Sequence, residues 1–132
     1  MVIYVDFENV HLSGLDGIEN LSSKDKVYIY CRDCDVLRIK SLLKGKKIKS
    51  SVECRIVQGK TKNALDFELI SDLFSDQRSR MKIIVSKDKG YDAAIDRGLR
   101  NGRLIFRKKS LNQKGFETSL ESLNDGCCII TI

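Results

Sequence analysis

Several residue types and patterns are missing from this chain or rare in it. The 132-residue sequence contains no proline, no tryptophan and a single histidine, His11. No apolar run approaches the roughly 20 residues that a membrane-spanning helix needs, and the apolar segment at the N-terminus is too short for the core of a secretory signal. We therefore expect a cytoplasmic protein with no membrane partner.

The five cysteines lack the arrangement of a structural zinc site. Cys31 and Cys34 have the spacing of a zinc knuckle or a redox pair, but the sequence has no second such pair and His11 lies far from them. Since the sequence carries no secretory signal, we expect reduced thiols. We expect no structural zinc, and core or incidental cysteines are the simpler interpretation.

Length and composition describe one ordinary globular domain. Hydrophobic residues make up 42% of the chain and charged residues 32%, and 132 residues suit one core but not two. The net charge of +6 permits a nucleic-acid partner without establishing one. Basic residues gather at 44–49, at Lys60 and Lys62, at Lys87 and Lys89, and at 107–109. Solvated loops are the simpler interpretation of any single cluster, and no interleaved aromatic residues form a stacking platform.

The chain begins with a strand that ends in a carboxylate. Residues 2–5 are an unbroken β-prone apolar run, which is typical of a strand buried on both faces of a parallel sheet. Asp6 follows at once. In open α/β sheets ligands bind outside the carboxyl ends of the strands, and a buried charge without a partner is costly. Asp6 is thus a candidate to meet a cation, with a turn or N-cap role as the alternative.

Strands and helices alternate along the rest of the sequence. The hydrophobic pattern predicts strands over 2–5, 27–31, 52–57, 81–85 and 104–106, and helices over 36–43, 64–74 and 91–100, with short helical turns within 11–25. A further helix over 117–123 and an apolar run over 128–132 close the chain. The alternation predicts a single three-layer α/β/α domain with a central, mostly parallel sheet.

Four aspartates are expected near one edge of this sheet. Asp6 and Asp88 each follow a strand, so they lie close together if their strands are neighbours. Asp66 is near the start of a helix at the same edge, and Asp92 is in the first turn of the helix after Asp88. Asp66 and Asp92 have an alternative role as acidic residues that interact with the helix dipole.

Crowded carboxylates repel one another unless a cation lies among them. Oxygen ligands without cysteine or histidine favour Mg²⁺ or Mn²⁺ over zinc. Such an ion orients a phosphodiester and lowers the pKa of a bound water molecule. With water as the nucleophile, the chain needs no Ser–His or Cys–His pair.

Three motifs make this interpretation more specific. Residues 4–10 (YVDFENV), 62–69 (KNALDFEL) and 86–92 (SKDKGYD) resemble motifs of PIN-like domains, especially of the bacterial branch close to the NYN nucleases. The resemblance covers residues 1–109. Residues 110–132 are then a C-terminal extension, which we expect to pack on the same domain.

The resemblance implies the sheet order 3-2-1-4-5, a Mg²⁺ or Mn²⁺ site, and endonucleolytic hydrolysis of single-stranded RNA by metal-activated water. The catalytic, metal-binding acids would be Asp6, Asp66, Asp88 and, as a fourth, Asp92. Supporting polar residues would be Asn9, Asn63, Glu8 and Ser86. The lysines expected at substrate phosphates are Lys62, Lys87 and Lys89, although Lys87 has an alternative role in neutralising the acids, and Ser86 one in capping its loop.

One departure from the family pattern bears on activity. Many PIN domains carry a second Asp two residues after the third acid, where this chain has Gly90. Either Asp92 substitutes for it or the site is weaker. A PIN-like module that binds RNA or a partner protein without cleaving is therefore the alternative function.

A phospho-acceptor receiver domain is a third interpretation. It would need an acceptor Asp at the end of the middle strand, where the sequence has Gln58-Gly59-Lys60. Exposed edge strands and the apolar residues 127–132 also predict a homodimer.

Overall fold

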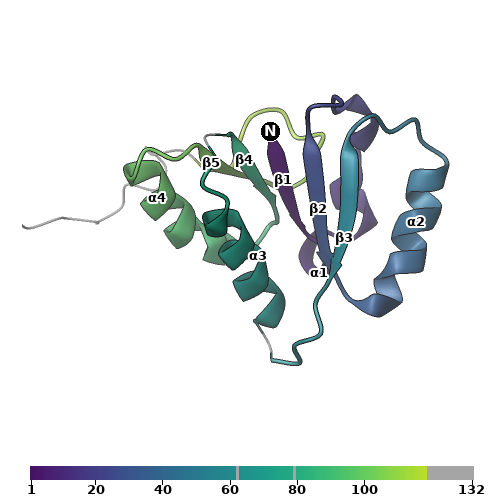
Figure 1. The fold of residues 1–132 in the computed structure, drawn as a ribbon, viewed down its shortest axis with the longest axis horizontal. Helices are drawn as coiled ribbons and strands as arrows, with labels where there is room; N and C mark the ends of the chain where they lie inside the picture. Colours follow the sequence, from purple (N-terminus) through teal and green to yellow (C-terminus); the bar gives the residue numbers. More distant parts are fainter. Residues whose placement is uncertain (62, 79, 119–132) are drawn as a thin grey trace, which may run out of the picture.

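The computed structural model describes residues 1–61, 63–78 and 80–118. Its five strands are all parallel and form one sheet in the order β3-β2-β1-β4-β5 (Figure 1). The strands are β1 (Val2–Asp6), β2 (Lys26–Cys31), β3 (Ser51–Ile56), β4 (Lys82–Val85) and β5 (Ile105–Lys108). The α-helices are α1 (Phe7–Val10), α2 (Val36–Lys44), α3 (Ala64–Ser75) and α4 (Asp92–Arg100). Short 3₁₀ helices are η1 (Leu12–Leu15), η2 (Ile18–Asn20), η3 (Asp33–Asp35) and η4 (Lys89–Tyr91).

The predicted fold class is confirmed, including the strand order. Each strand and helix predicted up to residue 109 is present, with small shifts at its ends. The largest shift is in β5, which continues to Lys108 because Arg107 and Lys108 pair with Ile84 and Val85 of β4. Of the helix predicted over 117–123, Glu117 and Thr118 are not helical, and the rest lies outside the described residues, as does the apolar run over 128–132.

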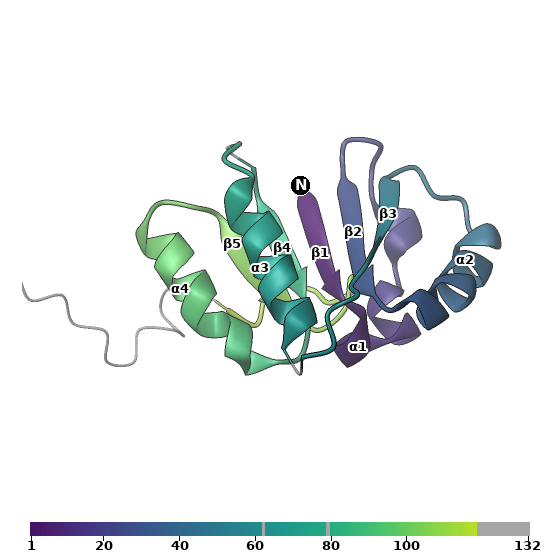
Figure 2. The same cartoon turned by 60° about the horizontal axis from the view of Figure 1, so that its bottom comes forward.

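Two hydrophobic cores lie on the two faces of the sheet. Every residue of β1 is buried, because alternate side chains enter opposite cores. Ile3 and Val5 pack in the core that contains Ile39 of α2. Val2 and Tyr4 pack in the core under α3 and α4. The two helix layers in Figure 2 therefore cover a sheet that has no solvent-exposed face at its centre.

The sheet register determines which residues lie next to one another at the carboxyl edge of the sheet. Val5 pairs with Ile29 of β2 on one side and with Val85 of β4 on the other. The next residues, Asp6 and Ser86, therefore emerge side by side at the carboxyl edge of the two central strands. None of the helices in the described part of the chain is both long and apolar enough to cross a membrane.

Residues 110–118 lie against the sheet and its connections. The Leu111 amide donates to the Gly14 carbonyl at 3.0 Å, and the Glu117 amide donates to the Arg107 carbonyl at 2.8 Å. The ring of Phe116 stacks on that of Phe106 at 4.3 Å. This part of the predicted C-terminal extension thus contacts the domain, while a domain boundary at residue 109 stays a prediction.

Candidate functional site

Asp6 is a buried carboxylate at the centre of the carboxyl edge. The residue is 3% exposed and follows the fully buried strand β1. Its Oδ2 accepts hydrogen bonds from the Ser86 hydroxyl at 3.1 Å and the Tyr91 hydroxyl at 3.1 Å. The pKa of Asp6 is raised to about 6, mainly by burial and in part by the neighbouring charge of Asp66, against the opposing effect of the hydrogen bonds. The folded protein thus disfavours the ionised form of Asp6.

Tyr91 joins Asp6 to Asp66. Its hydroxyl lies 3.1 Å from Asp6 Oδ2 and 2.9 Å from Asp66 Oδ1. Burial, followed by the charges of the two carboxylates, raises the pKa of Tyr91, so its hydroxyl stays protonated. A single phenolic hydrogen donates fully to only one acceptor at a time. The Tyr91 hydroxyl therefore cannot donate a full hydrogen bond to Asp6 and to Asp66 at the same time.

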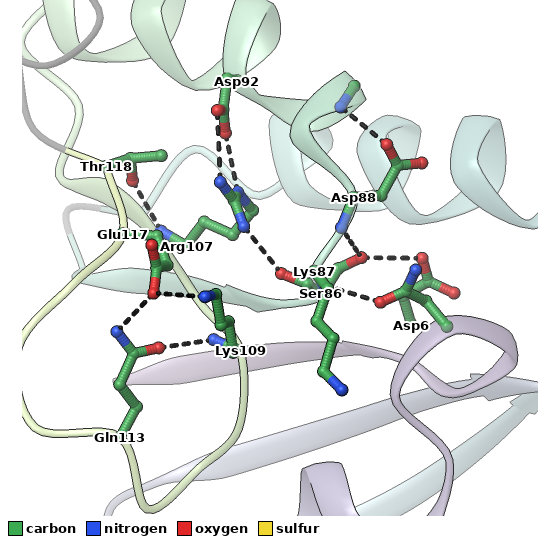
Figure 3. A network of polar contacts seen from close by, with 12 residues as sticks. Asp6, Ser86, Lys87, Asp88, Asp92, Arg107, Lys109, Gln113, Glu117 and Thr118 are labelled. Carbon is green, nitrogen blue, oxygen red and sulfur yellow. Dashed lines mark hydrogen bonds and ion pairs between the residues drawn. The ribbon is translucent and has the colours of Figure 1, made fainter.

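The loop between β4 and η4 carries Asp88. The fully buried Ser86 connects this loop to Asp6, because its hydroxyl donates to the Asp6 carboxylate and accepts from the Asp88 amide at 3.1 Å (Figure 3). The Asn9 side-chain oxygen accepts from the Lys87 amide at 2.7 Å. Both contacts tie the loop to the end of β1. Asn9 and Ser86, predicted as supporting residues, thus hold the position of the Asp88 backbone.

Gly90 shapes the same loop. Its amide donates to Asp88 Oδ1 at 2.8 Å, so one carboxylate oxygen of Asp88 is bound within the loop. A Cβ atom at this position would lie 3.0 Å from that oxygen, which is a tight contact. A larger residue here would press on the Asp88 carboxylate.

Asp92 lies at the same edge but has a cationic partner. Its two carboxylate oxygens face Arg107, with Oδ1 2.7 Å from Nε and Oδ2 3.3 Å from the terminal nitrogen (Figure 3). Arg107 is buried, and its other terminal nitrogen donates to the Ser86 carbonyl at 3.1 Å. The structure thus places Asp92 in an ion pair that supports the Ser86 backbone. Its predicted role as a fourth metal-binding acid stays a prediction, and this ion pair counts against it.

The remaining predicted site residues are less closely connected to Asp6. The Glu8 carboxylate pairs with Arg32 Nε at 2.6 Å. Asn63 precedes α3 without a side-chain capping bond. Lys87 and Lys89 are exposed on the Asp88 loop, and Lys62 lies outside the described residues. Hydrogen bonds therefore link Asp6 to Ser86 and, through Tyr91, to Asp66. Ser86 and Asn9 hold the backbone of the Asp88 loop, and Glu8 lies in a separate contact.

The charges of the three central acids are not balanced by a cation within the described residues. The ion pairs there include none to Asp6, Asp66 or Asp88. In the same residues, no three His, Cys, Asp or Glu side chains stand close enough together to hold a metal ion. The donors are nevertheless carboxylate and hydroxyl oxygens, which suit Mg²⁺ and Mn²⁺. A buried carboxylate without a cation is also the group that gains most from one.

A cavity of about 450 Å³ opens beside these acids, between α3 and α4. Asp66 and Asp88 line it on the side of the site. The rest of its wall is mainly apolar and includes Phe67, Ile70, Ala93 and Ala94. The edge of the sheet thus combines a group of acids with an adjoining apolar surface.

Three residues that support this edge are absent from the sequence-based site. Tyr91 was given no site role beyond the start of a helix, although its place within the Asp88 motif is a usable signal. Arg107 belonged to a basic cluster interpreted as a surface feature, just beyond the strand predicted over 104–106, and its burial follows from the extension of β5 to Lys108. Arg32 donates to the Val57 carbonyl at 3.0 Å as well as to Glu8, and no local pattern indicates this.

Comparison with known proteins agrees with the fold and the motifs. A family model described as a PIN domain matches residues 1–108. No curated protein and no solved structure matches the chain. Because the family model spans most of the sequence, the chain belongs to the PIN domain family, a family of metal-dependent nucleases.

Proposed function

We propose that this PIN domain is a metal-dependent endoribonuclease of single-stranded RNA, from the branch close to the NYN nucleases. The observation that carries the proposal is the environment of Asp6. Asp6 is 3% exposed, and its carboxylate contacts two hydroxyl groups and has no cationic partner among the described residues. Tyr91 links it to Asp66, and Ser86 links it to the Asp88 backbone.

Asp6, Asp66 and Asp88 would hold the ion, Mg²⁺ or Mn²⁺. When bound, the ion would lower the pKa of a water molecule and offset charge at the phosphate. We leave Asp92 out of the proposed ligands because Arg107 already neutralises it. The proposed ion would then be held by three carboxylates instead of four.

The protein side chains have separate tasks in this proposal. Ser86 and Asn9 hold the loop that carries Asp88. Tyr91 stays protonated and keeps Asp6 and Asp66 together while no ion is bound. The exposed Lys87 and Lys89 would attract the RNA backbone, since salt-sensitive phosphate contacts supply most of the affinity for nucleic acid. Lys62 has the same proposed role. A cytoplasmic location and a homodimer stay predictions.

A second candidate function is an RNA- or protein-binding module that does not cleave. Two observations favour it: Gly90 replaces a family acid, and the described acids do not form a ready group of three ligands. Such a module would keep salt-dependent RNA binding without metal-dependent cleavage.

Cleavage of a labelled single-stranded RNA in Mg²⁺, Mn²⁺ or EDTA tests the proposal. The full chain would be compared with Asp6→Ala and Asp88→Ala, and with Asp16→Ala as a matched control in an exposed loop. We expect cleavage that needs metal, disappears in the first two variants and persists in the control. Cleavage that survives in Asp6→Ala or Asp88→Ala would remove that residue from the site. An inactive parent that still binds RNA would favour the binding module.

A further inference from the structure

The cavity between α3 and α4 has a wall unsuited to phosphate. Two carboxylates, Asp66 and Asp88, line it, and none of the described lining residues is Lys or Arg. Beyond the proposed ion at these acids, an RNA phosphate entering the cavity would find no cationic side chain among the described lining residues. The rest of the wall offers side chains such as Ile70 and Ala94, which favour an uncharged, weakly solvated group.

Phe67 gives this wall an accessible aromatic ring. It follows Asp66 directly in the first turn of α3 and is 70% exposed, although it is among the largest apolar residues of the helix. By contrast, Leu65, Leu69 and Leu73 of the same helix are buried in the core. An exposed ring beside a cavity and next to a site carboxylate is well placed to stack on a planar ligand.

The small residues across from Phe67 leave room for such a ligand. Ala93 and Ala94 of α4, and Gly90 before it, line the cavity, whose volume is about 450 Å³. That volume lies within the range of sites that enclose small organic molecules. A nucleobase therefore fits by size, while Asp66 and Asp88 remain at one side of the cavity.

We propose that this cavity binds one base of the RNA substrate, with Phe67 stacking on the base, and thereby sets which phosphate reaches the acids. The inference rests on the proposed nuclease function, because it takes the RNA backbone to lie at Asp6, Asp66 and Asp88. The phosphate then lies at the polar group of acids, and its neighbouring base lies in the adjoining, mainly apolar cavity. Phe67 is a residue that binds substrate and has no part in activating water.

The first experiment measures cleavage of single-stranded RNAs in which one nucleotide at a time lacks its base. We expect the parent to lose about tenfold in kcat/KM at one position near the cleaved phosphate, the equivalent of one base–aromatic stack. Phe67→Ala should lose about as much on intact RNA, mainly through KM, and become indifferent to the missing base. Phe67→Trp should restore both the rate and the dependence on the base.

Two further variants separate stacking from general effects. Ala94→Leu narrows the cavity without changing Phe67, and we expect it to weaken binding in the same way. Leu37→Ala is the matched control, because Leu37 is also an exposed apolar helix residue, at 78%, but lies on α2. It should behave as the parent does.

A second experiment uses RNA that carries the fluorescent base 2-aminopurine, in EDTA, so that binding is read without cleavage. Quenching by the parent and by Phe67→Trp, but not by Phe67→Ala, would support a stacked base. If the parent cleaves RNA and Phe67→Ala equals it in both experiments, the base site is overturned and the nuclease stands. If the parent quenches through Phe67 but never cleaves, the nuclease and the role of the cavity in selecting a phosphate are overturned, and only base binding stands. A parent that neither cleaves nor binds RNA overturns both.

Discussion

Asp6 and Asp92 lie at the same edge of the sheet and differ in what surrounds them. Asp6 contacts the hydroxyl groups of Ser86 and Tyr91, and burial raises its pKa to about 6. Asp92 faces the guanidinium of Arg107, which is itself buried. One carboxylate is thus left with an uncompensated charge, and the other is neutralised by the protein.

This difference indicates separate roles for two acids that sequence motifs place together. An ion pair with a buried arginine satisfies Asp92 within the fold and ties it to the Ser86 backbone. Asp6 gains no such partner, so folding alone leaves it in an unfavourable state that a bound cation would relieve. A charge left unbalanced in this way marks a candidate site more sharply than the residue type does.

The largest expected effect is on cleavage, where variants of a proposed ligand and of Asp92 should differ. We expect Asp66→Asn to lower the rate by about a hundredfold or more, because it removes a proposed ligand charge. Asp92→Asn should keep most of the rate, since the asparagine oxygen still accepts from Arg107. The measurement is single-turnover cleavage at saturating Mn²⁺, corrected for the folded fraction of each variant. Equal losses in the two variants would return Asp92 to the metal-binding acids.

Replacing the cation tests the other half of the comparison. Arg107→Met removes the partner of Asp92 and the donor to the Ser86 carbonyl, so we expect a loss of about 3 kcal/mol in the free energy of unfolding. The control is Arg38→Met, because Arg38 pairs with Asp35 at the surface with 57% of its side chain exposed. That change should cost under about 1 kcal/mol. Urea unfolding without metal gives both values, and similar losses would show that burial of Arg107 adds nothing.

Asp6→Asn should stabilise the metal-free protein, and the gain should depend on pH. Folding raises the pKa of Asp6 from 3.8 to about 6, so the folded state prefers the neutral acid. The contribution of Asp6 to the free energy of unfolding is therefore fully present below about pH 4 and is lost as pH rises through about 6. Above that pH we expect the variant to be about 2 kcal/mol more stable than the parent, and near pH 3.5 equal to it.

Urea unfolding across this pH range, in EDTA, measures the effect. Asp16→Asn at an exposed position serves as the control and should show no such dependence. Saturating Mg²⁺ should reverse the order, because the parent alone gains the full energy of ion binding. A variant that is less stable than the parent at pH 7 without metal would contradict an unfavourable charge at Asp6.

Much of the fold was predictable because hydrophobic periodicity reports burial locally. The apolar run of β1 indicated a strand covered on both faces, and the stripe in α3 indicated one buried side. The order of neighbouring strands came from a family resemblance, and with it the meeting of Asp6 and the Asp88 loop. The contacts that support the site were harder to predict from the sequence. Asn9 was expected to assist the site, but its bond to the Lys87 amide depends on the register between β1 and β4.

The sequence by itself determined the alternation of strands and helices and the positions of the acids relative to strand ends. These features depend on short-range spacing, since side-chain periods of two and 3.6 residues persist in any context. Only the tertiary structure decided that Asp92 has a cationic partner and that Asp6 has none among the described residues. Arg107 lies on β5 and reaches Asp92 because β5 packs beside β4 and under α4. Tyr91 lies between Asp6 and Asp66 because α3 and α4 cover the same face of the sheet. Such contacts join distant segments, and electrostatic balance depends on distances that no local pattern encodes.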